Sequence, residues 1–257
     1  MRILHLTDLH LRHHQAGTAG VPERLSRDMP RVLVDLADRI PALDVDAVVI
    51  SGDLLDVPDE VLSGGSPNGF DRSEWLTSIE NDLQLVRGWL LGLGIGYVIC
   101  SGNHDHEPSI RRVFPEAADF VDIAGIRFFS FWDELGPDRQ PRRTGARLDL
   151  FEGALTEPEH DLPQVHVQHY IIDPPTTRNN WRYEYLGAQD FKQQLEASGR
   201  VRAVLSGHYH PGIWVTSDKV VYSGPPAFCE APHAFRIYEL DDYGNVLVEE
   251  HAVSDQE

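Results

Sequence analysis

The sequence predicts an α/β protein in which two mixed β-sheets pack face to face, with helices outside them. Helical periodicity separates the strand-like runs in the first half of the chain, whereas short hairpin-like strands dominate the second half. In addition, five apolar strand-like runs end abruptly in Gly, Asp, Asn or His. Because these endings are evenly spaced along 257 residues, we expect a single domain spanning residues 1–257.

The five strand endings carry residue types that bind metal ions and transfer protons. In chain order they supply Asp8 and His10, then Asp53, then Asn103 and His104, then His169, and finally His208 and His210. One such ending carries little weight, since Gly-Asn is ordinary turn chemistry and a lone His is usually structural. Open α/β sheets bind ligands at the carboxyl ends of their strands, so we expect the five endings to meet at one edge.

The first half of the chain contains two helical patterns. One begins with Asp28 as N-cap, has Pro30 in its first turn and ends at Pro41. Gly, Ser, Pro and Asn are concentrated in residues 57–70, which predicts a surface loop. Apolar residues at helical spacing then predict a second amphipathic helix over about residues 73–93.

The second half is predicted to contain mainly short strands. Residues 120–131 form two apolar runs around Ala124 and Gly125, which predicts a hairpin. Residues 133–159 are polar and rich in Arg, Pro and Gly, so we expect irregular structure there. A helix is expected over about residues 189–197, and four short strands follow the last ligand pair.

Composition excludes several classes of function. The chain carries 22 Lys and Arg against 41 Asp and Glu, a formal net charge of -19, so stable nucleic-acid binding is not expected. The longest apolar runs are too short to cross a bilayer, and the first residues do not form a signal peptide. We therefore expect a cytoplasmic protein that does not interact with membranes. The sequence leaves its oligomeric state open.

The five strand endings, taken in chain order, read D-x-H, G-D, G-N-H-D, H and G-H-x-H. This series of motifs resembles that of the calcineurin-like metallophosphoesterase superfamily over residues 8–210. The pattern is closest to that of the bacterial class III phosphodiesterases, the cyclic nucleotide type. The resemblance implies a four-layer αββα sandwich, the calcineurin-like phosphoesterase fold, with the ligand loops gathered at one edge.

The resemblance also implies two metal ions. The first ion would be bound by Asp8, His10 and His210, and the second ion would be bound by Asn103, His169 and His208. Asp53 would bridge the two ions. Seven ligand-type residues exceed what one ion uses while leaving room for water and substrate. Carboxylates, imidazoles and one amide oxygen suit divalent transition-metal ions, namely Mn²⁺, Fe²⁺/Fe³⁺ or Zn²⁺.

Two further residues are assigned catalytic roles by the resemblance. A hydroxide bridging the metals would attack phosphorus, and His104 would protonate the leaving oxygen or stabilise the charge on phosphorus. Asp56 would orient His104. Val57 and Pro58 replace the Arg-Gly that follows in the protein phosphatases, which argues against a phosphoprotein phosphatase.

The substrate is expected to be a small-molecule phosphoester. Residues 178–185 hold two Arg, two Asn and three aromatic residues, and we expect Arg178, Trp181 and Arg182 to contact the substrate. A surface loop whose aromatics anchor it to the core is an equal alternative. Together these features predict a dinuclear phosphodiesterase acting on cyclic nucleotides or nucleotide-like diesters. The alternatives are a phosphomonoesterase or nuclease of the same superfamily, and a noncatalytic metal-binding scaffold.

Overall fold

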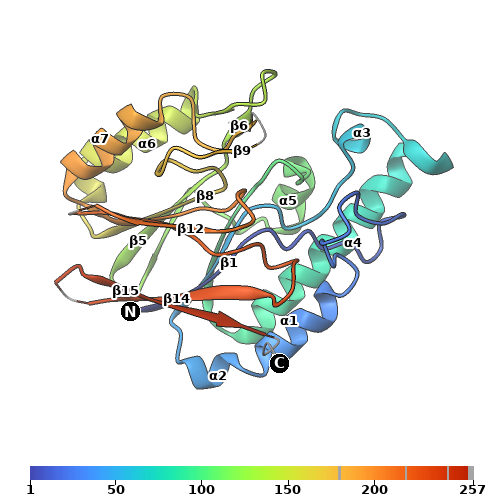
Figure 1. Cartoon of the computed structure of the whole chain (residues 1–257), viewed down its shortest axis with the longest axis horizontal. Helices are drawn as coiled ribbons and strands as arrows, with labels where there is room; N and C mark the ends of the chain where they lie inside the picture. The colour runs from blue at the N-terminus through green and yellow to red at the C-terminus, as the bar shows by residue number, and fades with distance from the viewer. Residues whose placement is uncertain (179–180, 218, 242, 254–257) are drawn as a thin grey trace.

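Two β-sheets pack face to face, and helices cover the outer face of each (Figure 1). This is the four-layer αββα arrangement expected from the sequence. The structure, a computed structural model, describes residues 1–178, 181–217, 219–241 and 243–253.

The first sheet has the strand order β15-β14-β1-β2-β3. Its strands are β1 (Arg2–Leu6), β2 (Ala47–Ser51), β3 (Gly96–Cys100), β14 (Ala234–Leu240) and β15 (Val246–Ala252). β1, β2 and β3 run parallel, whereas β14 pairs antiparallel with both β1 and β15. The carboxyl ends of the three parallel strands therefore lie at one edge of the sheet.

The second sheet has the strand order β12-β13-β11-β8-β5-β4. Its strands are β4 (Phe120–Ile123), β5 (Ile126–Phe131), β8 (Gln164–Gln168), β11 (Val201–Leu205), β12 (Ile213–Thr216) and β13 (Val221–Gly224). The four central strands are parallel, and β4 and β12 pair antiparallel at the edges. The β4–β5 pair confirms the predicted hairpin.

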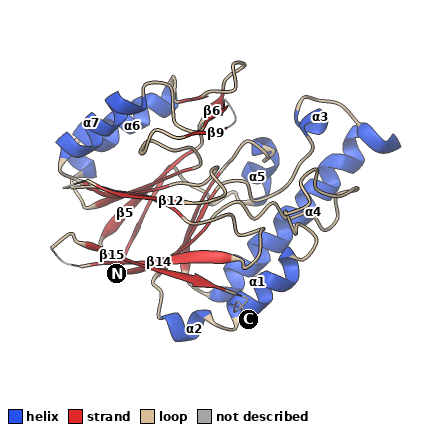
Figure 2. Ribbon diagram, viewed as in Figure 1, coloured by secondary structure: helices blue, strands red, loops and turns tan. Residues whose placement is uncertain are grey.

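Helices occupy both outer layers (Figure 2). They are α1 (Met29–Ala37), α2 (Ile40–Leu43), α3 (Asp59–Leu62), α4 (Arg72–Leu93), α5 (Glu107–Val113), α6 (Ala146–Thr156) and α7 (Ala188–Ser198), with 3₁₀ turns at Pro67–Gly69 and Pro158–His160. α1 and α4 cover the first sheet, and α6 and α7 cover the second. Among the helices that the structure describes, none has the length and apolar character needed to cross a bilayer.

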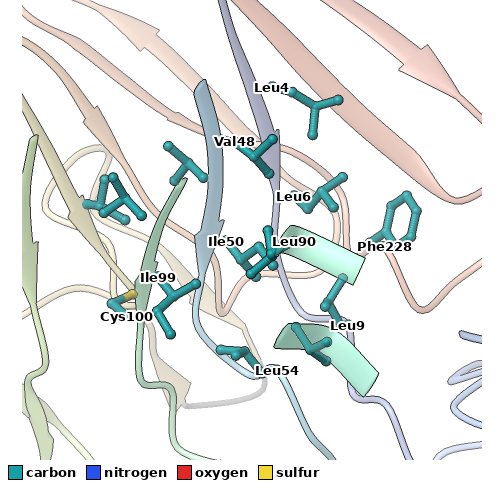
Figure 3. Close-up of a cluster of buried hydrophobic side chains, with 14 of the residues drawn as sticks. Leu4, Leu6, Leu9, Val48, Ile50, Leu54, Leu90, Ile99, Cys100 and Phe228 are labelled. Carbon is teal, nitrogen blue, oxygen red and sulfur yellow. The ribbon is translucent and has the colours of Figure 1, made fainter. Parts of the chain in front are cut away.

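The core explains why each sheet is apolar on two faces. Figure 3 shows Leu4, Val48 and Ile50 of the first sheet packed together with Leu90 of α4. In the second sheet side chains alternate, so that Phe128 joins this core while its neighbour Phe129 packs under α6 and α7. Both sheets are therefore held from two sides, which gives the loops at their carboxyl edges a rigid base.

Three predictions about individual elements were wrong. The first helix does not continue to Pro41: α1 ends at Ala37, and Pro41 lies in the first turn of α2, where its missing N–H breaks no hydrogen bond. Residues 57–70 are not only a loop, because they contain α3 and a 3₁₀ turn. Residues 133–159 are not irregular either, because they contain the strand β6 (Glu134–Leu135), its partner β7 (Pro141–Arg142) and α6.

Candidate functional site

The five predicted strand endings meet at one edge of the sandwich. β1, β2 and β3 of the first sheet lead into the loops of Asp8, Asp53 and Asn103, and β8 and β11 of the second sheet lead to His169 and His208. Backbone hydrogen bonds tie these loops together: the Asp8 N–H donates to the Gly52 carbonyl at 3.2 Å. The two sheets therefore contribute to a single site.

One cluster of donor atoms combines Asp8, His10, His210 and Asp53. His10 Nε2 lies 3.3 Å from His210 Nε2, 3.8 Å from Asp8 Oδ1 and 3.6 Å from Asp53 Oδ2. His210 Nε2 lies 3.6 Å from Asp8 Oδ1. Two imidazole nitrogens and two carboxylate oxygens therefore converge on one point, which is the donor set predicted for the first metal ion together with the predicted bridge.

A second cluster shares the same oxygen of Asp53. His169 Nε2 lies 3.3 Å from Asp53 Oδ2 and 3.2 Å from Asn103 Oδ1. Donor atoms of His208, His169 and Asp53 all lie within 4.8 Å of one another. Asp53 Oδ2 is thus the one atom common to both clusters, which is the geometry a bridging carboxylate needs.

The outer atoms of these side chains are held by the protein. Asp8 Oδ2 accepts hydrogen bonds from the Thr7 hydroxyl at 2.8 Å and the His208 N–H at 3.1 Å. His169 Nδ1 donates to the Ser51 carbonyl at 2.9 Å, and His210 Nδ1 donates to Glu230 Oε1 at 2.5 Å. Each bond fixes a ring or carboxylate and leaves the inner atom free to coordinate, as outer-shell partners do in metal sites.

Unpartnered buried atoms show that the site fits metal ions. Asp8 Oδ1 and His208 Nε2 are buried and have no hydrogen-bond partner among the described residues. An unpaired buried polar atom is costly, and a coordinated cation removes the cost for a carboxylate oxygen such as Asp8 Oδ1. The nitrogen and oxygen donors suit the transition-metal ions named above.

The backbone is strained at the same place. Asp8, His10, Asp53 and His208 have φ between 43° and 66°, the left-handed region that non-glycine residues seldom occupy. Each such residue costs of the order of 1–3 kcal/mol, and such strain clusters at ligand and active sites. Four strained residues within one set of candidate ligands indicate that the fold stabilises their side-chain positions at the expense of backbone energy.

Two glycines of the endings are required by close packing. A Cβ on Gly102 would lie 2.2 Å from Asp53 Oδ1, and a Cβ on Gly207 would lie 1.9 Å from the Thr7 hydroxyl. Neither contact is possible, so any larger residue would displace Asp53 or the Asp8 loop. The glycines that precede Asn103 and His208 therefore have a steric function.

Electrostatics set the protonation states of three of the ligands, Asp53, His10 and His208. Burial alone raises the pKa of Asp53, but His169 and His104 outweigh it and hold this pKa well below its usual range. Burial lowers the pKa of His10 and of His208 well below the usual value. The central carboxylate is thus anionic and these two imidazoles are neutral, the forms that bind cations.

His104 and Asp56 lie beside the first cluster. The His104 N–H donates to Asp53 Oδ1 at 2.8 Å, and its ring meets that of His10 edge to face at 4.9 Å. His104 Nδ1 is 3.8 Å from Asp56 Oδ1, too far for a hydrogen bond. Asp56 Oδ1 instead accepts from Arg24 Nη1 at 2.9 Å. Asp56, the expected orienting partner of His104, thus lies near that ring without a hydrogen bond to it and forms an ion pair with Arg24 that the sequence did not indicate.

An open pocket of about 1080 Å³, here called the main pocket, lies over the clusters. Asp53, Asn103, His104, His208 and His210 line its floor. Its walls include the side chains Arg24, Arg139, Arg178, Trp181, Tyr183 and Glu230. Its floor is thus formed by the candidate metal ligands and His104, and its walls are rich in Arg and aromatic residues.

Part of the predicted substrate-contact segment forms a wall of this pocket. Arg178 and Trp181 line it from the short strands β9 (Thr177–Arg178) and β10 (Trp181–Arg182), but Arg182 is exposed and is not among the lining residues. In a paired strand successive side chains point to opposite faces, so Trp181 and Arg182 diverge. Asn179 and Asn180, which belong to the same predicted segment, lie outside the described residues.

Sequence reasoning missed three residues of the site: Arg24, Arg139 and Glu230. The Arg139 guanidinium stacks on the Trp181 ring at 4.1 Å, although Arg139 lies in the region predicted to be irregular. None of the three directly follows one of the five apolar strand-like runs, and none belongs to a recognisable motif. Only tertiary contacts bring them to the site.

Comparison with solved structures finds the same fold in proteins of low sequence identity. A dimetal phosphatase from zebrafish has a TM-score of 0.67 at 14% identity, covering 99% of this chain and 96% of that chain. Purple acid phosphatase PPD1 from yellow lupin seeds has a TM-score of 0.65 at 13% identity, covering 99% of this chain and 52% of that chain. GAP50, the anchor in the inner membrane complex of Plasmodium, has a TM-score of 0.58 at 11% identity, covering 100% and 86%.

No curated protein sequence matches the chain. The family model for calcineurin-like phosphoesterases matches residues 1–212, a span that contains all seven candidate metal ligands and His104. The chain therefore belongs to the calcineurin-like phosphoesterase family of metal-dependent hydrolases.

Proposed function

We propose that the protein hydrolyses small phosphodiesters, with a nucleotide-like substrate bound in the main pocket. The observation that carries this proposal is the main pocket itself, whose lining includes Arg178, Trp181 and Tyr183 together with the shared Asp53. Guanidinium groups bind phosphate oxygens, and aromatic rings pack against a base or sugar. A pocket with both kinds of wall suits a small organic phosphate ester.

The donor clusters support two divalent transition-metal ions as cofactors. One ion would be held by Asp8, His10 and His210, and the other by Asn103, His169 and His208. Asp53 Oδ2 would be a ligand of both ions. When bound, such ions lower the pKa of water and withdraw charge from phosphate oxygens. The chain's own contribution is the fixed arrangement of these ligands through Thr7, Ser51 and Glu230.

His104 is proposed as the group that protonates the leaving oxygen. It lines the main pocket, 22% of its side chain is exposed, and its backbone N–H is anchored to Asp53. An imidazole can hold and release a proton near neutral pH. The nearby Arg24–Asp56 ion pair holds a guanidinium group close to His104.

Phosphomonoester hydrolysis is the second candidate, because two of the similar structures are phosphatases. Their likeness shows the fold alone, and the breadth of the main pocket favours a substrate with an organic group on it. A role as an anchor, as GAP50 is described, would not require His104 or a lined pocket.

The two enzymatic candidates are separated by substrates that share a leaving group. We expect the metal-loaded protein to cleave the 4-nitrophenyl ester of thymidine 5′-phosphate with a higher kcat/KM than 4-nitrophenyl phosphate. Both reactions release nitrophenolate, so a difference in kcat/KM reflects the thymidine group that only the diester carries on phosphorus. A higher kcat/KM on the monoester would refute the diesterase proposal, and no turnover of either ester would favour the scaffold.

A further inference from the structure

A second, smaller pocket of about 520 Å³ lies beside the main pocket. Arg24, Asp59, Val21 and His104 line both pockets, so the two meet at His104. None of the seven candidate metal ligands lines the second pocket, in contrast to the main pocket. His104 therefore separates the metal-ligand floor from a cavity to which the established family membership assigns no role.

The position of His104 indicates which part of the substrate the second pocket binds. This inference rests on the function proposed above. In phosphoryl transfer the attacking and leaving oxygens lie roughly in line on opposite sides of phosphorus. If His104 protonates the leaving oxygen, the group attached to that oxygen must extend past His104, away from the metal ligands. We propose that the second pocket binds the leaving alcohol of the diester.

The bond changes balance with water as the only co-reactant. Water supplies the oxygen of the new P–O bond, and the bond between phosphorus and the leaving oxygen breaks, with its electron pair staying on that oxygen. The leaving oxygen takes a proton from His104 and departs as the free alcohol. A proton from the attacking water restores His104.

The charges of the second pocket define the class of alcohol. Both of its guanidinium groups are already engaged: Arg12 Nη2 donates to the Asp56 carbonyl at 2.6 Å, and Arg24 Nη1 donates to Asp56 Oδ1 at 2.9 Å. Asp59 and Glu60 of α3 are exposed carboxylates on the same wall. This balance does not favour an anionic leaving group, so the structure assigns an uncharged polyol or a cationic amino alcohol to the second pocket.

The exposed carboxylates of Asp59 and Glu60 supply hydrogen-bond acceptors in the second pocket. A leaving alcohol with a second hydroxyl group can donate to one of these carboxylates, whereas methanol lacks that hydroxyl. The site is therefore expected to discriminate between leaving alcohols of different length.

The test compares esters that share one nucleotide and differ in the leaving alcohol. We would measure kcat/KM for the glyceryl, 2-aminoethyl, carboxymethyl and methyl esters of thymidine 5′-phosphate, following release of thymidine 5′-phosphate. The glyceryl and aminoethyl esters should exceed the methyl ester by about tenfold or more, the lower end of what a small additional binding group contributes. The carboxymethyl ester should gain nothing over the methyl ester.

Two variants test the pocket directly. Gly20 lines the second pocket, and a Cβ there meets nothing within 4 Å, so Gly20→Trp should fill the pocket and bring the glyceryl-to-methyl ratio toward one. Gly92→Trp, on an exposed face of α4 and outside both pockets, is the matched control and should keep the wild-type ratio. Glu60→Lys should reverse the preference between the aminoethyl and carboxymethyl esters.

The outcomes separate this inference from the proposed function. Hydrolysis of all four esters at equal kcat/KM, or ratios that neither Gly20→Trp nor Glu60→Lys changes, would overturn the leaving-group pocket and leave the diesterase intact. Failure to hydrolyse any diester would instead refute the proposed function. If Gly20→Trp does not fold, the Glu60→Lys comparison still decides the question.

Discussion

Replacing Glu230 with Gln should weaken one metal site and leave the other unchanged. Glu230 Oε1 accepts the Nδ1–H of His210 at 2.5 Å, and this hydrogen bond holds the pKa of Glu230 below its usual value, against the opposing effect of burial. The carboxylate fixes the His210 ring and increases the electron density on Nε2. An uncharged Gln keeps the size of the side chain and loses most of this effect.

The expected size of the change follows from the position of Glu230. Removing an outer-shell partner of a metal ligand costs about 10- to 100-fold in affinity, or about 1.4–2.7 kcal/mol. Since 32% of the Glu230 side chain is exposed, water replaces part of the lost interaction. We therefore expect the lower half of that range, about 10- to 30-fold.

The assay is a titration of metal-free protein with Mn²⁺ or Zn²⁺ in the presence of a competing chelator, resolved into two binding steps. One dissociation constant should rise in Glu230→Gln and the other should not. Glu239→Gln, which removes an exposed carboxylate 3.0 Å from Arg2, is the matched control and should change neither. Two unchanged constants in Glu230→Gln would show that His210 does not depend on Glu230 for its coordination.

Two further predictions concern the site and its walls, and a third concerns the buried Asp133–Arg143 ion pair. His104→Ala should keep the metal content and lower turnover about 10²- to 10⁴-fold. The loss should be smaller on nitrophenyl esters, because their leaving group needs no proton. Equal losses on all esters would reassign His104 to phosphate binding. Trp181→Ala should raise KM more than it alters kcat, whereas Arg182→Ala, outside the main pocket, should leave KM unchanged. Asp133→Ala should lower the free energy of unfolding by about 3–5 kcal/mol, because it removes the ion-pair partner of the fully buried Arg143 side chain. Denaturant titrations measure this change, and a loss below about 1 kcal/mol would contradict the prediction.

The strand endings could be predicted because each is recognised from a few neighbouring residues in the sequence. An apolar run followed within three residues by Asp53 or Asn103 fixes both the strand and the edge at which the side chain emerges. The strand endings supplied the ligand-type residues and the family resemblance assigned seven of them to metal ions, and the structure brings all seven together. Helix α4 could be predicted for the same reason, because its apolar residues recur at helical spacing; the Asp71 capping box at its start is seen in the structure.

The rest depends on contacts that no local pattern records. Glu230 reaches His210, and Arg24 reaches Asp56, across long stretches of chain. α6 was missed because only Phe151, Ala154 and Leu155 are buried in it, too few for a clear helical period. The preference of Asp56 for Arg24 over His104 is a difference of about 1 Å, which is set by the packing of the loops around them.

The most direct test of the dinuclear site is the metal content of the active protein. Elemental analysis of purified, fully active protein should find close to two transition-metal ions per chain, and chelation should abolish hydrolysis until two equivalents are restored. Asp53→Asn should lower the affinity of both sites, because Asp53 Oδ2 belongs to both clusters. Full activity with one ion per chain, or an Asp53→Asn variant that loses only one site, would contradict the shared-carboxylate site described here.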